Sequence, residues 1–291
     1  MNNAILYILT VFIWGSTWIG IKYQLGVVSP LVSIGHRFAL AALMIFAFLW
    51  LRGGLQRLPL RDHLFVALQG LCLFCINYVF IYHGTQTLTS GLVAVVFSTM
   101  VILNLLGSAA FLGTRASPVV AVGGLIGLLG MVGVFYPELE SLSLTDQTVQ
   151  ALLLVFFGTL SASAGNLLAV RNQRHQVPLL LCNGWGMLYG TLAVYAAALL
   201  LGQEIRVDYS ASYLLSLLYL SLFGSVVAFW AYLSLVANIG ADRAAYSSLL
   251  FPIVALLIST LFESYAWTWM SLAGFALVLL GNWLVMRRGA A

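Results

Sequence analysis

The chain has 291 residues, of which 62% are hydrophobic and 7% are charged, and its formal net charge is +4. Because an ordinary soluble domain carries about a quarter charged residues, this composition excludes a water-soluble globular protein and indicates a protein solvated by lipid. The positive charge does not indicate a nucleic-acid partner, since lysine occurs only at Lys22 and the arginines form no basic stripe.

Apolar runs that can cross a membrane follow one another along the chain. A hydrocarbon core about 30 Å thick needs roughly 20 apolar residues per helix, and ten runs reach this length. In chain order they cover residues 4–23, 31–51, 64–83, 88–112, 118–136, 149–170, 178–201, 213–237, 243–262 and 268–286. They show no strand-like alternation, so the sequence predicts an all-α membrane protein with ten transmembrane helices.

The arginines predict how these helices are oriented. If the N-terminus is cytoplasmic, nine basic residues lie in cytoplasmic loops or helix ends, and only Lys22 and Arg206 lie outside. The positive-inside rule therefore predicts that both termini are cytoplasmic. We expect a multi-pass protein of the cell inner membrane, with the lipid bilayer as its surroundings.

The predicted helices divide into two groups of five. An acidic segment, residues 137–148, separates residues 1–136 from residues 149–291, and we expect it to be a periplasmic connecting loop. Two glycines seven residues apart recur in the last helix of each half, as Gly123 and Gly130 and as Gly274 and Gly281. Because five is odd, the second half enters from the opposite face. This predicts two inverted five-helix repeats, a transporter plan with the substrate site near the midplane.

Short motifs in both halves resemble the EamA unit of the drug/metabolite transporter superfamily. They are Trp14-Gly15-Ser16, Arg37-Phe38, Phe251-Pro252, the paired glycines, and Glu263 near the usual Gly-Glu. The first half departs from the family pattern with Gly113-Thr114 and Met100. Among ten-helix members the chain is most similar to the YddG-type amino-acid exporters. The resemblance implies export of aromatic and other neutral amino acids with broad specificity.

Polar and aromatic side chains near the predicted midplane are candidates for the substrate site, because lipid does not solvate polar groups. Trp14 and Trp18 lie one turn apart in the first helix and can wall a cavity or stack on a substrate, with packing as the alternative. The third helix adds Asn77, Tyr78, Tyr82 and His83. For Tyr82 and His83 the alternative is a place in the aromatic belt at the membrane surface.

The second half supplies its own candidates. In the sixth helix Ser163 and Asn166 continue a polar stripe from Thr159, which faces either a partner helix or a wet cavity. Further candidates for substrate binding are Trp230 in the eighth helix and Ser247 and Ser248 in the ninth. Pro252 frees a backbone carbonyl within the ninth helix and predicts a kink that can serve as a hinge.

Arg37 is the most costly polar group in the predicted spans. Burial of an arginine in a membrane helix costs about 3 kcal/mol on insertion scales. Its guanidinium can anchor a substrate carboxylate, or it can bond to helix-end carbonyls, the structural role that the resemblance favours. No carboxylate lies deep in a predicted span, so a proton relay through Asp or Glu is not expected.

The spans contain no nucleophile–base pair, phosphate loop or metal-ligand set, so we expect neither an enzyme nor a cofactor nor a bound metal. The sequence therefore predicts an exporter of amino acids or related small metabolites that works by alternating access between its repeats. A monomer is sufficient for this mechanism, and the oligomeric state stays open. The alternatives are efflux of drugs or other metabolites, a non-transporting membrane scaffold, and an intramembrane enzyme.

Overall fold

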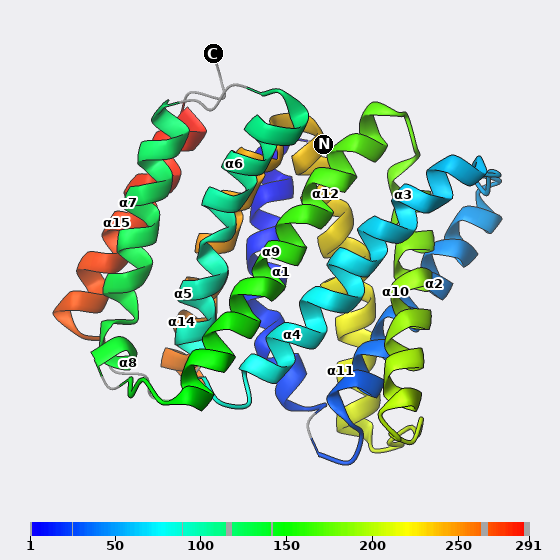
Figure 1. Cartoon of the computed structure of the whole chain (residues 1–291), viewed down its shortest axis with the longest axis horizontal. Coiled ribbons are helices and arrows are strands. Elements are labelled where there is room, and N and C mark those ends of the chain that lie inside the picture. Colours follow the sequence, from blue (N-terminus) through cyan, green and yellow to red (C-terminus); the bar gives the residue numbers. More distant parts are fainter. Residues whose placement is uncertain are drawn as a thin grey trace.

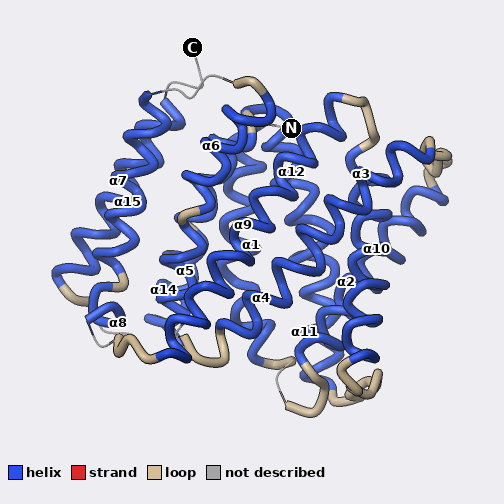
Figure 2. The backbone as a smooth tube through the Cα atoms, in the orientation of Figure 1, coloured by secondary structure: helices blue, strands red, loops and turns tan. Residues whose placement is uncertain are grey.

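All regular structure in the described part of the chain is helical, without a strand (Figures 1 and 2). The computed structural model describes residues 2–24, 26–88, 90–114, 118–140, 142–262 and 267–287. Among these residues, seven helices are long and apolar enough to cross a membrane, and three shorter apolar helices begin at Asn3, Pro118 and Trp269. These add up to the predicted ten.

The helices fall into two matching sets. The first half contains α1 (Asn3–Lys22), α2 (Pro30–Leu51), α3 (Leu60–Gly70), η1 (Leu71–Ile76), α4 (Asn77–Gly84), α5 (Ser90–Ser98), α6 (Met100–Leu112), α7 (Pro118–Val134) and the short α8 (Tyr136–Glu140). The second contains α9 (Asp146–Arg174), α10 (Leu179–Leu200), α11 (Ala211–Ser221), η2 (Leu222–Val227), α12 (Ala228–Ile239), α13 (Ala241–Ala244), η3 (Ala245–Leu249), α14 (Phe251–Phe262) and α15 (Trp269–Arg287).

The two sets run in opposite directions through the molecule. In Figure 1, α1 descends from the end where the N-terminus lies, whereas α9, the first helix of the second set, rises toward that end. The predicted all-α architecture of two inverted five-helix repeats is therefore confirmed. The predicted helix edges differ in places: α9 begins at Asp146, and α8 overlaps the segment 137–148 that was expected to be a loop.

Local sequence signals set where several helices begin and end. Ser29 accepts a hydrogen bond from a backbone N–H of the first turn of α2, and Pro30 occupies that turn. Thr145 and Ser210 cap α9 and α11 in the same way. The helix α6 ends at Gly113, whose φ of +66° lies in the left-handed region that favours glycine.

Two spans contain a π-helical segment at the same position. In the first half, η1 follows the eleven residues of α3, and in the second half η2 follows the eleven residues of α11. The wider turn of a π-segment takes some carbonyls out of the regular helical pattern, and such segments often mark functional sites. Both repeats therefore carry the same interruption in their third span.

The fourth span of each repeat is also interrupted at equivalent positions. In the first half, Thr99 separates the nine residues of α5 from α6. In the second half, the four residues of α13 and the five of η3 precede Leu250, and α14 begins after it. Pro252, the predicted hinge, is the second residue of α14 and lies directly after this interruption.

The last helices of the repeats, α7 and α15, pack against each other through glycine. A Cβ atom placed on Gly130 would lie 2.7 Å from the carbonyl oxygen of Gly274, and one on Gly281 would lie 2.6 Å from that of Gly123. Real Cβ atoms do not approach so closely, so only glycine lets these backbones meet. The glycine pairs that recur in the sequence form this contact.

Candidate functional site

Trp14 of α1 lies at the centre of an aromatic cluster between the two repeats. The centroid of its ring lies 4.9 Å from that of Phe229 and 5.1 Å from those of Tyr232 and Phe251. The partners come from α12 and α14, so one tryptophan of the first repeat is surrounded by rings of the second. Edge-to-face contacts of this kind fix the orientation of a ring.

Further rings extend the cluster through the first repeat. Phe74 of η1 lies 4.8 Å from Phe229 and 5.1 Å from Phe38, between ring centroids. Tyr78 lies 5.0 Å from Phe38 in the same measure and 6.5 Å from Tyr82. Three predicted site residues, Trp14, Tyr78 and Tyr82, thus belong to one row of aromatic rings.

Arg37 of α2 bonds to the π-segment η2 of the opposite repeat. Its Nε donates to the Ser225 hydroxyl at 2.9 Å, and its Nη2 donates to the Gly224 carbonyl at 3.1 Å. The indole Nε1 of Trp14 donates to the same carbonyl at 3.1 Å. The guanidinium also lies 5.3 Å from the centre of the Tyr78 ring, and only 2% of the residue is exposed. Of the two roles expected for Arg37, this geometry matches bonding to backbone carbonyls.

Asn166 connects the polar stripe of α9 to the aromatic cluster. Its Nδ2 donates to the Tyr232 hydroxyl at 3.0 Å and contacts the Met100 sulfur at 3.6 Å. The side chain is 1% exposed, and its Oδ1 has no hydrogen-bond partner among the described residues. Ser163, one turn away on the same helix, is also buried. A buried amide oxygen without a partner indicates a place where water or a ligand can bind.

Ser247 and Ser248 of η3 are buried, but their hydroxyls serve their own helix. They donate to the Ala244 and Ala245 carbonyls at 2.8 Å and 2.6 Å. These bonds support the 3-10 turn that precedes Pro252. The two serines therefore help to shape the interruption of this span.

The remaining predicted site residues lie apart from the Trp14 cluster or at its edge. Asn77 is buried and its Oδ1 has no partner in the described part of the chain. His83 is exposed, and its Nδ1 lies 2.8 Å from the Val79 carbonyl of its own helix. Trp230 packs half-buried against the apolar core. The side chain of Trp18 lies outside the described part of the structure.

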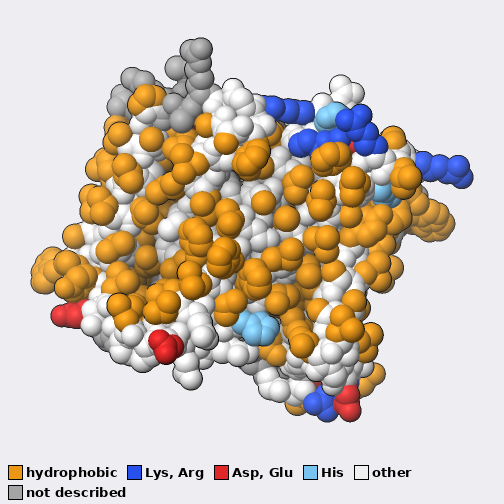
Figure 3. All heavy atoms as spheres, in the orientation of Figure 1, with side chains coloured by type: hydrophobic (Ala, Val, Ile, Leu, Met, Phe, Trp, Pro, Cys, Tyr) orange, Lys and Arg blue, Asp and Glu red, His pale blue; other side chains and the backbone are white. Residues whose placement is uncertain are grey.

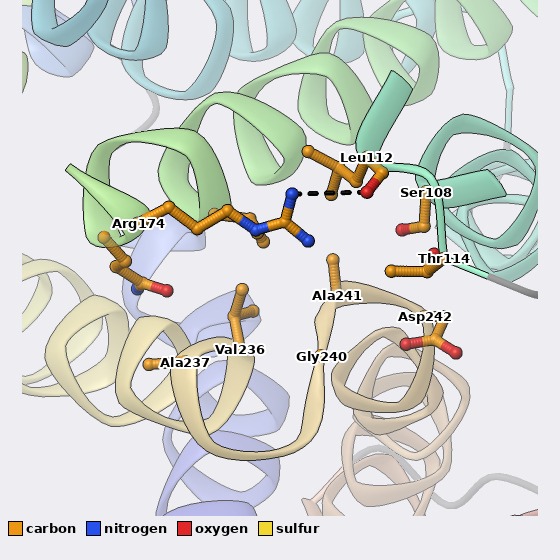
Figure 4. A pocket seen from close by; sticks show the side chains of 11 residues that line it. Ser108, Leu112, Thr114, Arg174, Val236, Ala237, Gly240, Ala241 and Asp242 are labelled. Atoms are coloured by element: carbon orange, nitrogen blue, oxygen red, sulfur yellow. Dashed lines mark hydrogen bonds between the residues drawn. The ribbon is translucent and has the colours of Figure 1, made fainter. Parts of the chain in front are cut away.

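An open pocket (Figure 4) lies among the ends of α6, α9 and α12, at the end of the molecule where α1 begins (Figure 1). Its volume is about 420 Å³. The residues that line it come from α6, α9, α12 and α13 and the links beside them: Ser108, Leu112, Thr114, Val170, Gln173, Arg174, Val236, Ala237, Gly240, Ala241 and Asp242. Arg174 donates from Nη1 to the Leu112 carbonyl at 3.2 Å, so the pocket wall joins both repeats.

Polar side chains lead from this pocket toward the aromatic cluster. Ser108 lines the pocket, and Asn104 lies one turn deeper on the same helix. Asn104 donates from Nδ2 to the Ala241 carbonyl at 3.1 Å, while its Oδ1 has no partner among the described residues. Asn166 lies one turn deeper than the lining residue Val170 on α9. Buried side chains that can hydrogen-bond therefore lie between the pocket and the Tyr232 ring beside Trp14.

Several residues of the aromatic cluster and of the polar groups beside the pocket were not predicted as site residues. They are Phe38, Phe74, Phe229, Tyr232 and Phe251, together with Asn104 and Ser108 in the first repeat. The spacing of Phe229 and Tyr232 places both on one face of α12, but it does not say whether that face contacts lipid or another helix. Among the described residues, no group of three His, Cys, Asp or Glu side chains could hold a metal ion.

Comparison with known proteins gives one consistent result. The sequence profile of the EamA-like transporter family matches residues 1–136 and again residues 149–287. The chain is 31% identical over 281 residues to the uncharacterized inner membrane transporter YedA of Escherichia coli strain K12, covering 94% of this chain and 89% of YedA. An uncharacterized transporter of Archaeoglobus fulgidus is 27% identical over 289 residues, which cover 99% of this chain and all of that protein.

Two further similarities extend over almost the whole chain. The protein PagO of Salmonella typhimurium is 24% identical over 266 residues, with 91% of this chain and 86% of PagO covered. A crystal structure superposes with a TM-score of 0.83 at 17% identity, covering 99% of this chain and 97% of the other. At that identity the superposition establishes the shared fold.

Proposed function

The chain belongs to the EamA-like transporter family, and we propose that it moves amino acids or related small metabolites across the inner membrane by alternating access. Its substrate would pass between the two repeats. The observation that carries the proposal is the pair of buried amides, Asn104 and Asn166, that lie between the open pocket and the rings around Trp14, each with an amide oxygen that lacks a partner among the described residues. Inverted-repeat transporters place their substrate site at such a repeat interface.

The aromatic cluster around Trp14 is suited to a substrate that has both an apolar and a polar part. The rings around Trp14 offer flat apolar faces, and Asn166 offers a buried amide oxygen that lacks a partner among the described residues. Ligand pockets commonly combine apolar walls with a few placed polar groups. We assign substrate contact to Trp14, Asn166 and Tyr78, and we expect Tyr82 and Ser163 to line the same route.

The distribution of charge supports the orientation. Most Lys and Arg side chains gather at the end where α1 begins, and most acidic side chains of the described residues lie at the other end (Figure 3); Asp62, Asp242 and Arg206 are exceptions. The first group includes Arg52, Arg61, Arg171, Arg174 and Arg243, and the second includes Glu140, Asp146, Glu204 and Asp208. We place the basic end in the cytoplasm. The pocket then opens inward, as an exporter that loads in the cytoplasm requires.

Transport in proteoliposomes tests the proposal. Purified protein is reconstituted, and efflux of a panel of labelled aromatic, aliphatic and charged amino acids is followed against empty liposomes. We expect flux of at least one neutral amino acid, and a loss of about tenfold in Trp14→Ala. Trp50→Ala is the matched control, because Trp50 is 71% exposed on α2. Absence of flux across the panel would contradict the substrate class, and equal flux in both variants would remove Trp14 from the site.

A further inference from the structure

We propose that the open pocket is a separate binding site for zwitterions, in which Arg174 binds the carboxylate and Asp242 the ammonium group. The inference rests on the proposed function, because it assigns the entry site of the transported metabolite. It concerns a place distinct from the Trp14 cluster, among the ends of α6, α9 and α12 and the start of α13.

Arg174 and Asp242 reach the pocket from different helices. Arg174 is the last residue of α9, and Asp242 lies in α13. In Figure 4 the guanidinium extends across the pocket toward Leu112, and the carboxylate lies on the side formed by α13. A guanidinium has five N–H donors, and the bond to Leu112 uses one nitrogen. The planar fork is suited to a carboxylate.

A second, independent observation points to a ligand in this pocket. Ser108 lines the pocket wall and is 4% exposed, yet its hydroxyl has no hydrogen-bond partner in the described part of the chain. Its oxygen points toward the pocket in Figure 4. Buried hydroxyls are nearly always bonded. A polar ligand in the pocket would supply the missing partner.

The size and the charges of the pocket together select the class of ligand. A volume of about 420 Å³ falls within the range of small-molecule sites. A simple amine would be attracted by Asp242 but repelled by Arg174, and a simple acid would experience the reverse. A molecule that carries both charges can pair with Arg174 and with Asp242 at the same time. The apolar residues Leu112, Val170 and Val236 can contact the side chain of such a molecule.

Three ligands of matched shape test the inference. Leucine carries both charges, 3-methylbutylamine lacks the carboxylate, and 4-methylpentanoate lacks the ammonium group. Binding of each to the purified full chain is measured by titration calorimetry. We expect leucine to bind at least tenfold more tightly than either single-charge compound. Equal affinities, or no binding of leucine, would overturn the inference.

Charge-removing variants locate the site. Arg174→Gln should weaken the binding of leucine and 4-methylpentanoate about tenfold and should not weaken the binding of 3-methylbutylamine. Asp242→Asn should weaken the binding of leucine and 3-methylbutylamine and should not weaken that of 4-methylpentanoate. Arg52→Gln and Glu140→Gln are the controls, since both residues are exposed and lie outside the pocket lining. Arg174→Lys keeps the positive charge but lacks the fork, so it should keep the preference for leucine over the amine at a lower affinity for leucine. Uniform weakening of all three ligands in both variants would contradict the assignment.

The transport assay separates this inference from the proposed function. Suppose that amino acids are transported, but that Arg174→Gln and Asp242→Asn do not change the affinity for leucine relative to the affinities for 3-methylbutylamine and 4-methylpentanoate. The zwitterion site is then refuted and the proposed function stands. If the crossed binding pattern is found but no amino acid is transported, the site stands and the proposed function is refuted.

Discussion

Trp14 and Arg37 donate to one carbonyl oxygen, that of Gly224, each at 3.1 Å. This carbonyl belongs to the π-helical segment η2 of the second repeat. A cation on α2 and an indole on α1 thus stabilise the same interruption in α11 and α12. The contact makes Arg37 a positioning residue for Trp14, because both share one acceptor.

Replacement of Arg37 should therefore affect both folding and transport. In Arg37→Gln the bonds to Gly224 and Ser225 are lost, and we expect the free energy of unfolding to fall by about 2 kcal/mol, the usual size for bonds to a charged donor. Thermal unfolding in detergent measures this. Arg57→Gln, in an exposed loop, is the control. If Arg37→Gln folds, a raised KM for transport at an unchanged maximal rate would support a role of Arg37 in positioning Trp14. An unchanged KM would contradict this role.

The hydrogen bond between Asn166 and Tyr232 can be tested by removing a single oxygen atom. Tyr232→Phe removes the hydroxyl that accepts from Asn166 Nδ2 and keeps the ring that packs on Trp14. We expect a loss of about 1 kcal/mol in stability, because a buried amide donor loses its acceptor. Transport should weaken through a higher KM. Tyr209→Phe is the control, since Tyr209 is 82% exposed. An equal effect of the two substitutions would argue against the central site.

The glycine contact between α7 and α15 predicts a strong effect of one methyl group. A Cβ on Gly274 would lie 2.4 Å from the Val134 nitrogen and 2.5 Å from the Gly130 carbonyl oxygen. Because the contacted atoms are backbone, the helices must separate, and we expect Gly274→Ala to destabilise the protein by about 2 kcal/mol. The melting temperature in detergent reports this. Gly54→Ala, where a Cβ meets nothing closer than 3.4 Å, should behave like wild type.

Hydropathy predicted the helices because membrane spans must satisfy their backbone internally and therefore need long apolar runs. The starts of the helices were less well predicted. The helix predicted from residue 64 begins at Leu60, since Asp62 and His63 are tolerated at the end of a span. The two π-segments were not predicted, because Leu71–Ile76 and Leu222–Val227 are ordinary apolar stretches.

The candidate site was predicted in part. Trp14, Tyr78 and Asn166 were singled out because polar and amphipathic groups are unusual at mid-membrane, and they lie in one connected centre. Phe74 and Phe229, which join them, were passed over. In lipid, an apolar ring gives no sign of whether it faces the bilayer or another helix, so only packing identifies it.

The two π-segments occupy equivalent positions but are held by unlike groups. The Gly224 carbonyl of η2 receives bonds from Arg37 and Trp14, whereas the Cys72 carbonyl of η1 receives one from the Ser161 hydroxyl at 3.0 Å. If the two repeats exchange conformations as proposed, the two end states differ in these contacts, and we expect them to differ in free energy. The state of lower free energy is then the resting state of the empty carrier. In that state the binding site is open to one side of the membrane, so that side has access to the site for more of the time. This bias sets how often each side is sampled, and accumulation against a gradient still requires a coupled source of energy.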